Sequence, residues 1–135
     1  MAARREAEGS RELVWMGSTK KDLMTCPEDV VDAFGHALEL AQRGETYSDA
    51  KPLVGDKAFK GAKVMEVVER SVDGTYRAVY TAKLETAVYV LHVFQKKSKS
   101  GIATPQADID LIKRRLKDAS TLDQQRLQQA RSEKP

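Results

Sequence analysis

Apolar residues along this chain follow two different spacings, which separate its helical from its extended segments. Between residues 30 and 41 they recur every three or four positions, a period typical of an amphipathic helix. Gly44 predicts the end of that helix. A shorter helix is predicted just after Ser18, which is a favourable N-terminal cap. The two segments lie so close in sequence that a helical hairpin is expected.

Three extended segments follow at short intervals and are rich in β-branched and aromatic residues. They cover residues 63–70, 75–83 and 87–95. The short links between them predict an antiparallel meander. The apolar run within the last segment has almost no polar interruption, which indicates a strand buried on both faces. Residues 12–16 predict a further short strand, which must pair at an edge or beside a meander strand.

A last amphipathic helix is predicted to begin at Thr104 and Pro105. The order strand, helix, helix, three strands, helix is that of a small α+β domain. We expect an antiparallel sheet of about four strands packed against the N-terminal helical hairpin, with the last helix at the C-terminal end. Residues 12–118 would form this domain. Residues 1–11 are predicted to be a disordered extension, and residues 119–135 a polar tail that either extends the helix or frays.

The composition limits the class of protein further. A length of 135 residues suits a single domain with loose ends. The lone Cys26 excludes an internal disulfide framework and fits a reducing compartment. There is no apolar run of the roughly 20 residues that a membrane helix needs. Residues 1–11 lack the apolar segment of a secretory signal, so a cytoplasmic protein with no membrane partner is expected.

The net charge of +3 is unevenly distributed along the chain. Residues 22–50 carry seven acids and one base, so the remaining residues carry an excess of nine positive charges. Such a chain is expected to offer a basic face to an anion, with an acidic helix elsewhere. The alternative to a functional basic face is that these surface charges cluster by chance.

Cationic residues gather where the predicted strands end. Lys96, Lys97 and Lys99 directly follow the last strand, where lysines also commonly protect a sheet edge. Four more cations lie in the preceding loop and at the start of the first meander strand: Lys51, Lys57, Lys60 and Lys63. Together these residues predict a surface that binds phosphate groups.

Arg77 lies inside the central strand of the meander, on the same face as Val79. A cation in such a place must find an anion or reach solvent. Two partners remain open: the carboxylate of Glu66 on the neighbouring strand, or a bound phosphate.

No metal or cofactor is predicted. His36, His92 and Cys26 lack the spacing of metal ligands, and no glycine-rich phosphate loop is present. His92 is expected to be a hydrogen-bonded core residue.

Several of these residues fall in an ordered set that resembles a known protein family. The segments Thr75-Tyr76-Arg77-Ala78-Val79-Tyr80 and Leu91-His92-Val93-Phe94-Gln95-Lys96-Lys97-Ser98, then Thr104-Pro105 and a helix, resemble the phage-derived branch of the RelE/HigB-like toxins. These belong to the RelE/ParE superfamily of toxin–antitoxin modules. The likeness covers about residues 12–118 and includes the helical hairpin.

The resemblance implies a ribosome-dependent endoribonuclease, an mRNA interferase that inhibits translation and needs no metal. Its implied partners are the ribosome, mRNA and a cognate antitoxin, often a helix-turn-helix protein. Arg77 corresponds to the arginine of the family's Tyr-Arg strand motif. Lys97 falls where a basic residue follows the last strand, with Lys96 beside it. The resemblance does not supply the general base, and two candidates stay open: a lysine whose pKa is lowered by burial or nearby cations, and Glu66, which lies on the strand next to Arg77.

The sequence also departs from RelE-type members in two places. Glu66 and Val68 stand where two lysines are expected, and residues 101–107 lack the tyrosine expected early in the last helix. Two other functions therefore stay open: a ParE-like toxin that inhibits DNA gyrase, and a non-catalytic basic RNA-binding or adaptor protein.

Overall fold

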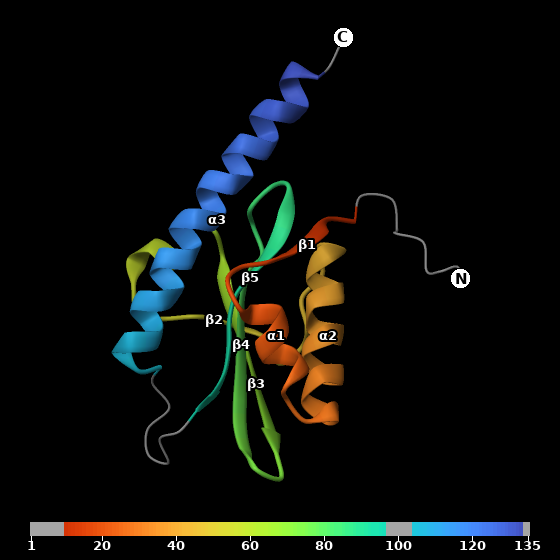
Figure 1. The fold of residues 1–135 in the computed structure, drawn as a ribbon, viewed down its shortest axis with the longest axis vertical. Helices are drawn as coiled ribbons and strands as arrows, with labels where there is room; N and C mark the ends of the chain where they lie inside the picture. The colour runs from red at the N-terminus through yellow and green to blue at the C-terminus, as the bar shows by residue number, and fades with distance from the viewer. Residues whose placement is uncertain (1–9, 97–103, 134–135) are drawn as a thin grey trace, which may run out of the picture.

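The computed structural model describes residues 10–96 and 104–133, which form a sheet with helices on both faces (Figure 1). The sheet has five strands in the order β1-β5-β4-β3-β2. The elements in chain order are β1 (Glu12–Trp15), α1 (Thr19–Met24), α2 (Glu28–Gln42), β2 (Lys51–Pro52), the 3-10 helix η1 (Lys57–Phe59), β3 (Val64–Ser71), β4 (Gly74–Thr81), β5 (Ala87–Lys96) and α3 (Gln106–Ser132). The α+β class is confirmed, and the elements predicted from the sequence occur in the predicted order, with β2 and η1 in addition.

The sheet is mixed, whereas the sequence predicted an antiparallel one. Strands β3, β4 and β5 form the expected antiparallel meander. β1 pairs with β5 in parallel at one edge. The two-residue β2 pairs with β3 at the other edge and was not predicted, because so short a segment with a proline carries no strand pattern.

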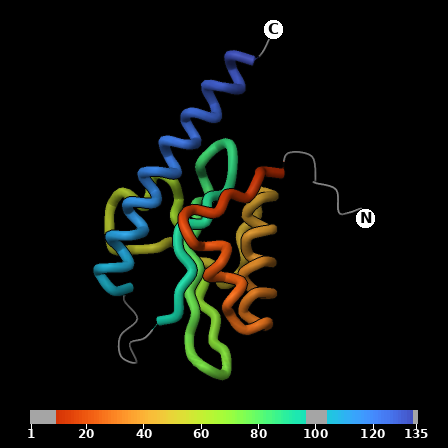
Figure 2. Tube along the Cα trace, in the orientation of Figure 1, coloured from red at the N-terminus to blue at the C-terminus, as the bar shows by residue number. Residues whose placement is uncertain are grey.

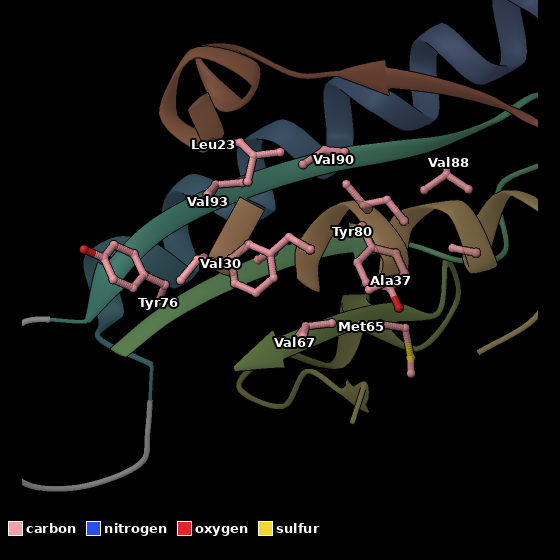
Figure 3. Close-up of a cluster of buried hydrophobic side chains, with 14 residues drawn as sticks. Leu23, Val30, Ala37, Met65, Val67, Tyr76, Tyr80, Val88, Val90 and Val93 are labelled. Carbon is pink, nitrogen blue, oxygen red and sulfur yellow. The ribbon is translucent and has the colours of Figure 1, made fainter. Parts of the chain in front are cut away.

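The helical hairpin covers one face of the sheet, as predicted. Phe34 and Val30 of α2 are fully buried and pack against side chains of β3, β4 and β5 (Figure 3). Tyr80 belongs to the same cluster, and its burial raises the pKa of its hydroxyl to about 12. This layer is therefore a close-packed apolar core.

The second face of the sheet is covered by α3, which the chain trace shows crossing it on the side opposite the hairpin (Figure 2). Ile109 and Ile112 of α3 pack there against Val79 and Leu91. β5, which lies between both layers, is buried along most of its length, in agreement with its uninterrupted apolar pattern.

A β-bulge interrupts the pairing of β4 with β5. Val79 lies opposite His92, whereas Tyr80 lies opposite Val90, so Leu91 is an extra residue on β5. Leu91 and His92 consequently both face α3, the first within the apolar cluster and the second against Asp108. The bulge thus directs the His92 side chain toward Asp108 in the first turn of α3.

Two terminal segments are tied to the domain. α3 continues through residues 119–132, so the polar tail extends the helix, which is one of the two alternatives left open. Its buried Asp123 accepts hydrogen bonds from the backbone N–H groups of Glu85 and Thr86. Arg11, which was assigned to the disordered extension, donates hydrogen bonds to the carbonyl oxygens of Ala41, Ala82 and Leu84. Residues 1–9 lie outside the described residues.

Candidate functional site

Arg77 projects from β4 on the face that α3 partly covers. Its Nη1 donates a hydrogen bond to Glu66 Oε2 at 3.0 Å and another to Thr104 Oγ1 at 3.2 Å. The ion pair is largely shielded, with 5% of the Arg77 side chain and 17% of the Glu66 side chain exposed. The sequence left two partners for Arg77 open, the Glu66 carboxylate and a bound phosphate. In the structure Arg77 is paired with the Glu66 carboxylate. Glu66 is thus the more accessible member of the pair.

A pocket of about 250 Å³ lies beside this ion pair at the edge of the sheet. Its lining consists of Ser48, Asp49, Lys51, Glu66 and Val68. Lys51 lies directly opposite Glu66 in the β2–β3 pairing, so an ammonium and a carboxylate share one face of neighbouring strands. The guanidinium of Arg77 contacts that carboxylate from the next strand. The pocket therefore combines a proton acceptor with nearby positive charge.

Lys96 lies on the same face of the sheet as Arg77. Phe94 is directly opposite Arg77, and Lys96 follows Phe94 by two residues on β5. Lys96 is therefore displaced along the strand by roughly 6.6 Å from the Arg77 row. Lys97 and Lys99 lie outside the described residues.

The other predicted cations are not part of the pocket lining. Lys57 lies in η1 and Lys60 directly follows it, whereas Lys63 precedes β3 and has a positive φ of 52°. The loop before η1 is joined to α3 by an ion pair of 2.9 Å between Lys113 and Asp56. Of the four lysines between residues 51 and 63, Lys51 lines the pocket together with Glu66.

His92 forms a second polar pair on this face. Its Nε2 is 2.7 Å from Asp108 Oδ1, and its ring stacks on Phe94 with the centroids 4.2 Å apart. Burial lowers the pKa of His92, against the opposing effect of Asp108. A neutral ring at pH 7 then donates from Nε2 to the Asp108 carboxylate, while Nδ1 is buried without a hydrogen-bond partner among the described residues. His92 is hydrogen-bonded and buried, as the sequence analysis expected.

The free energy of unfolding should depend on pH through His92. Because its folded pKa is lowered below 6.5, the unfolded state binds the proton more readily. Stability is then highest above pH 6.5 and declines as the pH falls through 6.5 toward the folded pKa. Urea unfolding at pH 7.5 and pH 5 measures this decline.

The matched control for that experiment is the exposed His36, which is the second histidine of the chain. A His92→Gln variant should lose part of the difference between the two pH values, whereas His36→Gln should retain it. An equal pH dependence in both variants would contradict the role assigned to His92.

Two residues of this region were missed by the sequence analysis. Thr104, expected to help start α3, instead accepts a hydrogen bond from Arg77. Asp108 binds His92 from the first turn of α3. An acid in the first turn of a helix is common for electrostatic reasons alone, so its sequence position gave no signal for this contact.

The described residues contain no group of three or more His, Cys, Asp or Glu side chains placed to hold a metal ion. Within the same residues, no helix combines the length and apolar character needed to cross a membrane.

Comparison with known proteins gives one family. A search of curated proteins returns no match. Residues 21–117 match the family described as phage-derived protein Gp49-like (DUF891). The matched residues include the last part of α1, all of α2, the pocket, the ion pair and the first part of α3. Since the match covers well over half of the sequence, the chain belongs to the phage-derived Gp49-like family.

Proposed function

We propose that this protein is the toxin of a type II toxin–antitoxin module and cleaves mRNA on the ribosome. Membership in the phage-derived Gp49-like family, which is toxin-like, supports a toxin. The main support for a nuclease is the pocket that Glu66 and Lys51 line from neighbouring strands. Arg77 contacts the Glu66 carboxylate from the next strand. Such an arrangement suits RNA, which supplies its own nucleophile and needs no metal.

In the proposed reaction, the Glu66 carboxylate takes the proton of an RNA 2′-hydroxyl. The 2′-oxygen bonds to the adjacent phosphorus, and the bond from phosphorus to the 5′-oxygen of the next nucleotide breaks. The products are a 2′,3′-cyclic phosphate and a 5′-hydroxyl, whose oxygen must take up a proton. Lys51, which lines the pocket opposite Glu66, is the cation that we assign as the proton donor. Lys96 lies four residues along β5 from the row of Glu66, roughly 13 Å away, and adds positive charge to the same face.

Charge develops on the phosphate oxygens during this attack, and positive charge at the pocket stabilises it. Lys51 lines the pocket directly. Arg77 holds the Glu66 carboxylate in place and adds a positive charge behind it. Lys97 and Lys99 would add charge from beyond the end of β5.

The partners in this proposal are the ribosome with its bound mRNA and a cognate antitoxin, expected to be a helix-turn-helix protein. The antitoxin would silence the toxin, which acts in the cytoplasm. A gyrase-directed toxin and a non-catalytic RNA-binding protein are the outcomes to be separated by experiment.

Primer extension on a reporter mRNA after induced expression tests the proposal. Cleavage that requires active translation supports the ribosome-dependent nuclease. DNA damage without RNA cleavage would replace it with a gyrase-directed toxin. The absence of both effects would indicate a binding protein without this chemistry.

A further inference from the structure

The three meander strands place cationic and apolar side chains in two neighbouring rows on the Arg77 face. Arg70, Thr75 and Lys96 lie opposite one another in adjacent strands and form the first row. Val68, Arg77 and Phe94 form the second row, two residues further along the strands. Directly paired residues project from the same face of a sheet, so both rows share one surface.

This surface extends beyond the start of α3. The β3–β4 hairpin continues past the first turn of that helix (Figure 1), and Asp108 in that turn contacts His92, which lies one row further in. Arg70 is exposed, Val68 is 37% exposed, and Phe94 and Lys96 are partly exposed. On the opposite face the alternate residues Val67 and Val93 are buried beneath the helical hairpin.

The spacing of the rows suits a polyanion with apolar bases. Two residues along a strand advance roughly 6.6 Å, a step similar to that between neighbouring phosphates in an extended single strand of RNA. Arg70 and Lys96 therefore lie one such step from the row of Arg77. The second row also offers the ring of Phe94 and the side chain of Val68, and aromatic and apolar surfaces hold unpaired bases.

We propose that this face is a subsite for single-stranded RNA, which binds a nucleotide close to the cleaved bond, two rows from Glu66 along β3. Arg70 and Lys96 bind its phosphate, and Phe94 with Val68 contacts its base. The subsite rests on the proposed function, since it is positioned relative to a reacting phosphate at Glu66 and Arg77. It adds Arg70, Phe94 and Val68 to the residues that select and hold the substrate.

The test is binding of a fluorescent 2′-O-methyl RNA hexamer to the purified full chain, measured by anisotropy at several salt concentrations. This RNA lacks the reactive hydroxyl, so binding is observed without cleavage. Arg70→Gln should weaken binding about fivefold at low salt and reduce the salt slope by about one unit, because one phosphate contact is lost. Phe94→Leu should weaken binding about fivefold with little change in the salt slope.

Lys20→Gln is the matched control, because Lys20 is an exposed cation on α1, which packs on the opposite face. It should bind RNA like the wild type, and thermal unfolding should show that every variant is folded. If Arg70→Gln and Phe94→Leu are folded and bind the hexamer with wild-type affinity, the subsite is overturned. It is also overturned if Lys20→Gln weakens binding equally, or if the wild type does not bind the hexamer. Equal competition by an acidic peptide would also overturn it in favour of a protein partner.

Cleavage of mRNA on ribosomes separates this subsite from the proposed function. Cleavage by the wild type together with unaltered hexamer binding by both variants rejects the subsite and retains the nuclease. Weakened hexamer binding by both variants, with no cleavage by the wild type, rejects the nuclease and retains an RNA-binding face.

Discussion

Arg77→Ala is expected to reduce mRNA cleavage on programmed ribosomes by about 10²–10³-fold, the range found when one charge-stabilising donor is removed from an active site. The guanidinium holds the Glu66 carboxylate at 3.0 Å and is the charge nearest to the proposed base among the contacts described. Its loss removes both the orientation of Glu66 and the positive charge behind the pocket. Single-turnover cleavage of a labelled mRNA, with growth arrest on induction as a second readout, measures the effect.

Because Arg77 also reaches Thr104 at the start of α3, Arg77→Ala can weaken the fold as well. Glu66→Gln separates the two effects, since the amide oxygen can still accept the hydrogen bond from Arg77 but cannot take a proton at neutral pH. It should lose about 10²-fold or more in cleavage rate. Because the largely shielded guanidinium of Arg77 then lacks its anion, thermal unfolding must show that the variant is folded at the assay temperature.

Glu69→Gln is the control for Glu66→Gln, because Glu69 lies on the same strand but on the opposite face. It should cleave mRNA at the wild-type rate. If folded Glu66→Gln and Arg77→Ala both cleave normally, the pocket is not the site of the reaction.

Asp123→Ala is expected to lower the free energy of unfolding by about 3 kcal/mol, because several buried donors lose their acceptor. The carboxylate receives hydrogen bonds from the N–H groups of Glu85 and Thr86 at 3.0 and 2.8 Å and from the hydroxyl of Tyr89 at 3.0 Å. It thereby fixes the β4–β5 turn to α3. Urea unfolding at pH 7 measures the change, and Asp118→Ala, at an exposed acid of the same helix, should have little effect.

The contribution of Asp123 should also disappear in acid. Burial raises the pKa of this carboxyl, but the hydrogen bonds from Thr86 and Glu85 outweigh burial and hold the pKa below its ordinary value of 3.8. The stabilisation is therefore present above about pH 3.8 and is lost as the pH falls through the folded pKa. Asp123→Asn should flatten this part of the stability profile, and an unchanged acid slope in that variant would contradict the assignment.

Local patterns in the sequence predicted the helices and strands that depend on interactions between residues close together in the chain. The apolar period of α2 and the short turns of the meander lie within a few residues of one another, so each can be recognised without knowing the rest of the chain. The pairing of Glu66 with Arg77 followed in the same way, because tight turns restrict the register of neighbouring strands. This is why the carboxylate partner was among the two alternatives considered.

Contacts between distant segments were not predictable. The parallel pairing of β1 with β5 depends on which sheet edge is free once the meander has formed. Thr104, Asp108 and Asp123 acquire their partners through the docking of α3, whose angle across the sheet is set by packing rather than by its own residues. Within a glutamine-rich segment, the sequence did not mark Asp123 as a buried acceptor.

The parallel pairing at the sheet edge has a consequence for how the protein is made. Glu12 lies opposite Ala87, and the side chain of Arg126 bonds to Glu12 across 114 positions of sequence. The N-terminal strand β1 cannot form these contacts until the ribosome has synthesised the downstream residues that it pairs with. Nascent chains should therefore become protease-resistant late in synthesis, which delays the appearance of an active molecule until nearly all of it has left the translating ribosome.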